Sequence, residues 1–187
     1  MHNKNHKFKY NEEERRQRQN PEEILYSIGL KENDTFIDLG CNDGFFTIPA
    51  SKIVGENGKV YGVDIDNDAI LRLIHKAENQ NISNIETKVE KAENIILPNG
   101  IADIIFLGTV LHDFQNPTKV LQNCKSILKD SGVIVDFDWS KEASGFGPPK
   151  DIRLSQKDVA DLCKKSGLKI IDEKSISENF YQITISK

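Results

Sequence analysis

Apolar and polar positions alternate along this chain in short blocks that predict strands and helices in turn. Short apolar runs between turn-forming residues indicate strands, whereas apolar residues three or four positions apart indicate helices. The predicted strands cover residues 35–40, 59–65, 84–90, 102–108, 132–139, 168–175 and 179–186. The run at 102–108, ADIIFLG, is strongly apolar, which is typical of a strand that is buried on both faces.

The predicted helices lie between these strands, and several begin at residues that cap helices well. Asn116 precedes a proline at the start of one helix, which we expect to end at Gly132. Ser155 and Asp158 form a capping box at the start of another. The predicted helices cover residues 21–28, 45–54, 69–77, 117–131 and 158–166.

Strands that alternate with helices are typical of a parallel sheet with helices on both faces. Right-handed crossovers narrow the topology to a doubly wound sheet, and the last two strands follow each other closely enough to pair antiparallel. We therefore expect an α/β fold with a Rossmann-like, doubly wound, mostly parallel seven-stranded sheet and an antiparallel C-terminal strand. Ligands of such sheets bind beyond the C-terminal ends of the strands.

Length and composition exclude several classes of protein. The 187 residues predict one domain, with a polar tail over 1–19 and a single domain over 20–187. The net charge of −4 argues against a nucleic-acid-binding surface, and no apolar run approaches the ~20 residues that span a bilayer. The three cysteines are widely spaced, so we expect neither disulfides nor a metal site. The absence of a disulfide framework favours a cytoplasmic location.

The loop after the first strand is the strongest chemical signal. It reads Asp38-Leu-Gly40-Cys-Asn42-Asp-Gly44 and leads into a helix. Glycine lets a ligand approach the backbone, and a helix N-terminus exposes unpaired N–H groups. The second strand ends in Asp64, whose carboxylate could accept both hydroxyls of a ribose. This combination predicts a nucleoside site.

The loop resembles the first motif, D/E-x-G-x-G-x-G, of the class I S-adenosylmethionine-dependent methyltransferases. A nicotinamide fingerprint would need glycine at positions 42 and 45, where the chain has Asn42 and Phe45. A carboxylate at Asp38 suits the positively charged amino group and sulfonium of S-adenosylmethionine. Asn42 replaces a glycine of the motif, and we expect a positive φ there because asparagine tolerates it.

The resemblance extends from about residue 20 to the C-terminus and is closest to small methyltransferases of the ubiquinone/menaquinone-biosynthesis type. It implies that Asp64 holds the ribose, that Ile65 packs on the adenine and that the Ala92 N–H contacts the adenine. Lys91 stands where the family has an aspartate. The implied cofactor-binding residues are Asp38, Gly40, Cys41, Asn42, Gly44, Asp64, Ile65, Lys91, Ala92, Leu107 and Gly108.

The resemblance predicts an S-adenosylmethionine-dependent methyltransferase that acts on a small molecule. The alternative is a catalytically weak or inactive module that binds the cofactor and serves as a regulator or partner subunit. His112 and Asp138 follow the fourth and fifth strands and are the candidate catalytic residues, with His112 as a general base. His112 could instead pack over the cofactor or cap its loop.

The acceptor is not identified by the sequence. We expect it to contact the loops at 109–116 and 139–153, and we expect a monomer or homodimer. The tail 1–19 is a candidate lid, because Phe8 and Tyr10 could cover an acceptor. Its arginines at 15, 16 and 18 could bind an anionic group.

Overall fold

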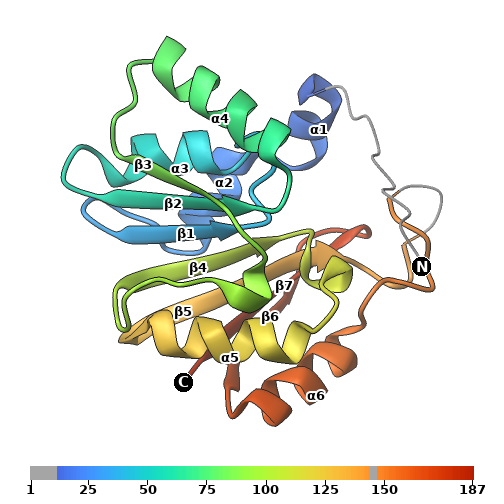
Figure 1. Ribbon diagram of the computed structural model, residues 1–187. Coiled ribbons are helices and arrows are strands. Elements are labelled where there is room, and N and C mark those ends of the chain that lie inside the picture. The colour runs from blue at the N-terminus through green and yellow to red at the C-terminus, as the bar shows by residue number, and fades with distance from the viewer. Residues whose placement is uncertain (1–11, 144–146) are drawn as a thin grey trace.

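Seven strands form one sheet in the order β3-β2-β1-β4-β5-β7-β6 (Figure 1). This computed structural model describes residues 12–143 and 147–187. The strands are β1 (Thr35–Leu39), β2 (Lys59–Asp64), β3 (Ile85–Val89), β4 (Ala102–Gly108), β5 (Leu128–Trp139), β6 (Lys169–Ser175) and β7 (Phe180–Ser186).

The directions of the strands confirm the expected fold class. Strands β1 to β5 pair in parallel, and β7 pairs antiparallel with both β5 and β6. The strand order reverses between β1 and β4, since β2 and β3 extend to one side of β1 and β5 to the other side of β4. In a doubly wound sheet this reversal is where a ligand binds, beyond the C-terminal ends of the strands.

Helices cover both faces of the sheet (Figure 1). The helices are α1 (Glu12–Arg18), α2 (Pro21–Ser27), α3 (Thr47–Val54), α4 (Asn67–Asn79), α5 (Pro117–Ile127) and α6 (Gln156–Ser166), with short 3-10 turns η1 (Ala92–Asn94) and η2 (Leu111–Asp113). In the described part of the chain, no helix combines the length and the apolar character needed to cross a bilayer.

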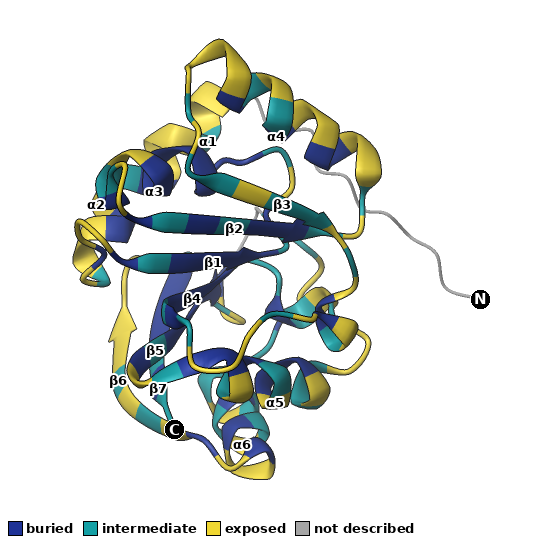
Figure 2. Ribbon diagram, turned by 60° about the vertical axis from the view of Figure 1, so that its left-hand side comes forward, coloured by how far each residue is buried: buried dark blue, intermediate teal, exposed yellow. Residues whose placement is uncertain are grey.

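The central strands β1 and β4 are mostly buried, as their apolar sequences predict and as the dark blue of Figure 2 shows. On β4, Phe106 packs in the same cluster as Leu25 of α2, whereas Leu107 packs in a second cluster with Leu121 of α5. The alternation follows from the two-residue repeat of a strand. The sheet is therefore the middle of three layers.

One predicted boundary is wrong. The helix after Asn116 ends at Ile127 rather than at Gly132, because Leu128 leaves the helical region and pairs with Ala102 of β4. Gly132 lies inside β5, near a shift in the β4–β5 register. A Cβ atom at that position would lie 2.6 Å from the carbonyl oxygen of Ala102. Glycine is required there by the close approach of two backbones and not by the end of a helix.

Candidate active site

The predicted site residues gather at the edge of the sheet where β1 to β5 end. These strands are parallel, so their C-terminal ends and the loops that follow lie on the same side of the molecule. The residues that the topology places at or just beyond this edge are Asp38, Gly40, Cys41, Asn42, Gly44, Asp64, Ile65, Lys91, Ala92, Leu107, Gly108, His112 and Asp138.

Three residues with positive φ shape the loop after β1. The angle φ is 77° at Gly40, 49° at Asn42 and 91° at Gly44. A Cβ atom on Gly40 would lie only 2.5 Å from Cγ2 of Val110, which follows β4. Glycine at this position therefore lets the two loops touch across the strand-order reversal. The positive φ predicted for Asn42 is confirmed, and asparagine accepts this backbone geometry at modest cost.

Hydrogen bonds fasten this loop to the end of β2. The N–H of Cys41 donates to the carbonyl of Val63 at 3.1 Å, and the N–H of Asn42 donates to a carboxylate oxygen of Asp64 at 2.8 Å. The other carboxylate oxygen of Asp64 accepts from the N–H of Asp66 at 2.9 Å. Two backbone donors thus fix the direction of the carboxylate that is predicted to hold a ribose.

Apolar side chains next to Asp64 face solvent. Ile65 is 67% exposed, and Val89, which pairs with Asp64 in the sheet, is 50% exposed. Exposed apolar surface beside a fixed carboxylate matches a nucleoside, whose base is flat and apolar and whose sugar offers hydroxyl groups.

The Cys41 side chain is buried in the same loop. Burial raises the pKa of its thiol far above the ordinary value, and the negative charges of Asp38 and Asp64 act in the same direction. The group stays protonated and packs near Gly62, where a Cβ atom would lie 3.3 Å from its sulfur. A protonated, enclosed thiol fills space and is not a nucleophile.

Asp38 is a buried carboxyl whose partner the sequence analysis did not identify. It is 2% exposed and accepts a hydrogen bond from the Thr47 hydroxyl at 2.6 Å. Burial raises the pKa of Asp38 to about 7, although this hydrogen bond and the positive charge of Arg15 lower it. The available signal was Thr47 itself, a polar residue in the apolar run Phe45-Phe-Thr-Ile.

The side-chain amide of Asn123, in α5, holds the segment that follows β3. Asn123 of α5 donates from its side chain to the carbonyls of Ala92, at 3.1 Å, and Glu93, at 2.7 Å. Ala92 is the first residue of η1, so its N–H lies at the N-terminal end of the turn, where backbone donors lack partners within the turn. Lys91 precedes it and is exposed.

Strained backbone follows β4. Leu107 is fully buried, and a Cβ atom on Gly108 would lie 2.6 Å from the ring of Phe106. Thr109 has a φ of 59°, which is costly for a β-branched residue. Its N–H donates to the carbonyl of Phe137 at 2.7 Å, which holds the strained residue in place. Strain of this kind is found at functional sites more often than elsewhere.

His112 and Asp138 form a buried hydrogen-bonded pair. The two carboxylate oxygens of Asp138 lie 2.8 and 2.9 Å from Nδ1 of His112, and the side chains are 2% and 3% exposed, respectively. Burial lowers the pKa of His112, but the hydrogen bond and charge of Asp138 outweigh it, so the pKa rises above 6.5. With Nδ1–H donating to the carboxylate, Nε2 is the nitrogen that exchanges the titrating proton.

A second buried carboxyl lies two positions before this pair. Asp136 is fully buried and accepts from the Tyr181 hydroxyl at 3.2 Å. Burial raises the pKa of Asp136 well above its ordinary value, and the nearby charge of Asp138 raises it further. Burial and the proximity of Asp138 thus both favour the neutral form of the Asp136 carboxyl.

Arg153 is a buried cation that the sequence analysis missed. It is 3% exposed, and its guanidinium donates to the carbonyls of Ser140 at 3.0 Å, Ala143 at 2.9 Å and Pro148 at 2.8 Å. It also lies 5.7 Å from the ring centroid of Trp139. These bonds tie the described positions 140, 143 and 148, between β5 and α6, to Arg153 near the end of β5. Nothing in the local sequence distinguishes this arginine from a solvated one.

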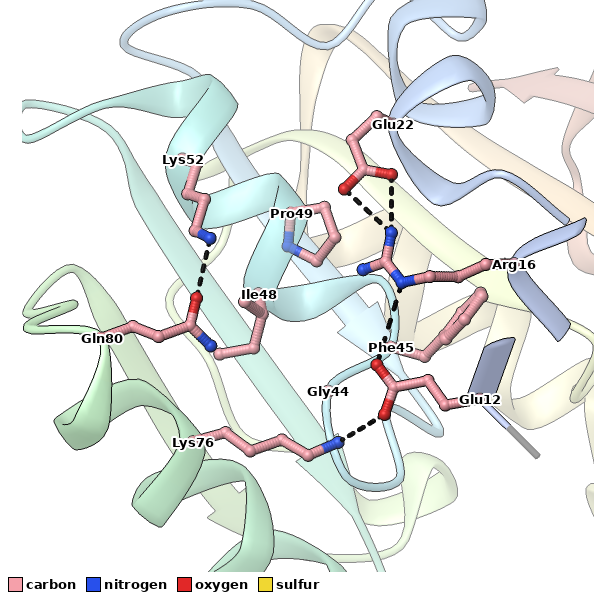
Figure 3. A pocket seen from close by; sticks show the side chains of 10 residues that line it. All are labelled: Glu12, Arg16, Glu22, Gly44, Phe45, Ile48, Pro49, Lys52, Lys76 and Gln80. Atoms are coloured by element: carbon pink, nitrogen blue, oxygen red, sulfur yellow. Dashed lines mark hydrogen bonds and ion pairs between the residues drawn. The ribbon is translucent and has the colours of Figure 1, made fainter. Parts of the chain in front are cut away.

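A groove of about 100 Å³ lies beside the loop after β1, among α1, α3 and α4 (Figure 3). Arg16 in its wall points between Glu12 and Glu22, and two hydrogen bonds join it to Glu22. Of the predicted cofactor-binding residues that the structure describes, Gly44 is the one that lines this groove. Asp64 and Ile65 do not line the groove, so it is distinct from the edge that they mark.

The chemistry of the residues at this edge fits S-adenosylmethionine. Asp38 would supply a carboxyl for the positively charged end of the cofactor, Asp64 an oriented acceptor for ribose hydroxyls and Ile65 an apolar surface for adenine. The glycine loop runs between Asp38 and the end of β2. Gly40 has no side chain, so the backbone of the loop is accessible to a ligand at that position.

Comparisons with known proteins agree with this fit. The family described as "Methyltransferase domain" matches residues 30–184. The chain is 28% identical over 119 residues to the ubiquinone/menaquinone biosynthesis C-methyltransferase UbiE of Proteus mirabilis, covering 63% of the chain and 47% of that protein. It is 23% identical over 120 residues to a demethylmenaquinone methyltransferase of a Geobacillus species, covering 64% of the chain and 51% of that protein. The chain spans about half the length of these curated relatives.

A solved structure of similar size also matches. The crystal structure of an S-adenosylmethionine-dependent methyltransferase from Aquifex aeolicus is 26% identical, with a TM-score of 0.84. The match covers 95% of this chain and 98% of that one. The similarity therefore extends over nearly the whole length of both chains.

The His112–Asp138 pair predicts the titration of the histidine. In NMR titrations of the four histidines, His112 should titrate above pH 6.5 in the native chain. In Asp138→Asn it should titrate below 6.5, because burial remains while the opposing charge is lost. Asp113→Asn is the control, since Asp113 is largely exposed and lies 3.7 Å from Nε2, and it should shift the pKa less. An unchanged titration in Asp138→Asn would mean that the pair does not form.

Proposed function

The chain belongs to the family of S-adenosylmethionine-dependent methyltransferase domains, and we propose that it transfers a methyl group to a small-molecule acceptor. The observation that carries the proposal is the glycine loop fastened to Asp64, with buried Asp38 at its start. We further propose that Asp64 holds the ribose, that Ile65 and the Ala92 N–H hold the adenine, and that the carbonyl of Leu107 or Gly108 faces the methionine end.

The chain's own residues would align the methyl donor with the acceptor and take a proton from the acceptor. When bound, S-adenosylmethionine supplies an electrophilic methyl group on a sulfonium. Transfer of this group is an in-line displacement, so most of the protein's contribution is alignment of donor and acceptor. In the proposal, His112 takes the proton of an acceptor hydroxyl or amine on Nε2, and Asp138 orients the ring through Nδ1 and stabilises the imidazolium.

The acceptor class rests on similarity and on charge. The UbiE relative is named for ubiquinone and menaquinone biosynthesis, and the net charge of −4 does not suit a nucleic-acid substrate. We propose a small molecule that reaches the loops at 109–116 and 139–153. The three buried free cysteines support a reducing compartment such as the cytoplasm.

Turnover distinguishes an enzyme from a module that only binds the cofactor. Purified chain incubated with S-adenosylmethionine and the small-molecule fraction of a cell extract should form S-adenosylhomocysteine, measured by mass spectrometry. His112→Gln should lower this rate about 100-fold or more if the histidine is the general base. His75→Gln, at an exposed histidine, should leave it unchanged. Binding of the cofactor without turnover in any extract would instead favour a regulator or partner subunit.

Asp64 provides a test of the cofactor assignment. Loss of its hydrogen bonds to a bound ribose should cost about 1–3 kcal/mol. Calorimetry of Asp64→Ala should therefore show about 5- to 150-fold weaker binding of S-adenosylhomocysteine. Asp68→Ala, in the first turn of α4, should bind as the native chain does. Unchanged affinity in Asp64→Ala would refute its assignment to the ribose.

The pKa of Asp38 predicts how cofactor binding depends on pH. A cationic ligand favours the charged form of this carboxyl, so below its pKa of about 7 binding must release a proton. Affinity for S-adenosylmethionine should fall as pH decreases from 7.5 to 6, by up to about tenfold per pH unit. Asp38→Asn should bind more weakly and lose this dependence. An equal slope in Asp38→Asn would assign the titration to another group.

A further inference from the structure

Thr109 is held in a backbone conformation that its own side chain disfavours. In residues 12–143 and 147–187, four residues other than glycine have a positive φ, namely Asn33, Asn42, Asn81 and Thr109. Asparagine is enriched several-fold at such positions, whereas a β-branched residue there is an outlier. The chain thus has asparagine at three of these positions and threonine at the fourth, where the backbone alone would favour asparagine or glycine.

Contacts on both sides keep the strained residue from relaxing. The N–H of Thr109 donates to the carbonyl of Phe137 at 2.7 Å, which joins the ends of β4 and β5. The next residue, Val110, packs so closely on Gly40 that a Cβ atom there would lie 2.5 Å from Cγ2 of the valine. Leu111, which follows, is fully buried. The path of this segment is therefore set by backbone and neighbouring residues, and not by the Thr109 side chain.

The hydroxyl group of Thr109 is not used by the fold. In the part of the chain that the structure describes, this hydroxyl has no hydrogen-bond partner. The Thr47 hydroxyl, by contrast, donates to Asp38 at 2.6 Å. Thr109 is half-buried, so its side chain remains within reach of a ligand. A threonine whose shape strains the backbone and whose hydroxyl serves no contact in the fold calls for another role.

Thr109 stands among the groups that the proposed function assigns to the reaction. It directly follows Gly108, at the end of β4, and precedes the proposed base His112 by three positions. It also opens the loop 109–116 that is proposed to contact the acceptor. β4 borders the reversal of strand order, beyond which ligands of doubly wound sheets bind. The residue therefore lies at the point of the fold where donor and acceptor would meet.

We propose that the Thr109 hydroxyl forms a hydrogen bond with the methyl acceptor and selects acceptors that carry a polar group beside the methylated atom. The inference rests on the proposed function and adds a specificity-determining residue to it. A hydroxyl both donates and accepts, so it suits a hydroxyl, amine or carbonyl group on the acceptor. An apolar acceptor would displace water from this hydroxyl without replacing the hydrogen bond, which lowers its affinity.

Other side chains expected to reach the acceptor do not carry the same argument. Phe8 and Tyr10, which were expected to cover it, lie outside the described residues. Of the arginines expected to bind an anionic group, Arg15 lies over an aromatic ring and Arg16 makes two hydrogen bonds to a carboxylate.

Turnover measured against the amount of acceptor tests the proposal. Purified chain with saturating S-adenosylmethionine would receive increasing amounts of the small-molecule fraction of a cell extract, and S-adenosylhomocysteine would be measured by mass spectrometry. Thr109→Val keeps the β-branch but removes the hydroxyl, so it should need about 3- to 10-fold more extract for the half-maximal rate. Thr109→Ser keeps the hydroxyl and should retain most of the native affinity for the acceptor. Thr87→Val, at a half-buried threonine of β3, should behave as the native chain.

Two further measurements separate recognition from folding. Calorimetry with S-adenosylhomocysteine should give the same affinity for the native chain, Thr109→Val and Thr109→Ser. Thr109→Asn should raise the melting temperature by about 2–4 °C, because asparagine accepts the positive φ at lower cost.

Each contrary outcome identifies a different error. Equally weakened binding of S-adenosylhomocysteine in Thr109→Val would assign the hydroxyl to the cofactor or the fold, and the proposal would be wrong. An unchanged extract requirement in Thr109→Val, or a Thr109→Ser variant as weak as Thr109→Val, would also overturn it. No gain in stability in Thr109→Asn would remove the premise that threonine is costly here. A native chain that binds S-adenosylhomocysteine but shows no turnover would refute the enzyme itself, and the role of Thr109 with it.

Discussion

The hydrogen bond from the Asn42 N–H to the Asp64 carboxylate sets the geometry of the whole cofactor-binding edge. It forms only because the chain turns through three residues with positive φ, and that turn brings the loop after β1 against the end of β2. The same turn starts α3 at Thr47, close enough for its hydroxyl to reach Asp38. It also places the Phe45 ring under Arg15. One bent loop therefore positions the carboxylate proposed to hold the ribose, a buried carboxyl and the aromatic ring of Phe45.

Buried carboxyl groups dominate the electrostatics of the site. A charged carboxylate without partners costs several kcal/mol when it is moved out of water. Each of the three here has a partner: Asp38 has Thr47, Asp136 has Tyr181 and Asp138 has His112. Burial raises the pKa of Asp136 well above its ordinary value and that of Asp38 to about 7. Both shifts have the same physical cause, because a carboxyl group removed from water favours its neutral form.

Sequence reasoning predicted the features that depend on local patterns. Apolar runs identified the strands, glycine spacing identified the loop, and the tolerance of asparagine for positive φ explained position 42. It failed where distant segments decide the outcome. The start of β5 at Leu128 depends on pairing with Ala102. Glycine is needed at position 132 because the backbone of β4 lies too close for a Cβ atom. Donors such as Thr47, Asn123 and Arg153 become partners only in the folded chain.

The way Arg153 holds the loop between β5 and α6 has an evolutionary consequence. The three acceptors that the structure describes for this arginine are main-chain carbonyls, which every amino acid possesses. These three hydrogen bonds therefore place no requirement on the side chains at positions 140, 143 and 148. Substitution there can change the surface at the end of β5 while the described anchor of the backbone stays in place.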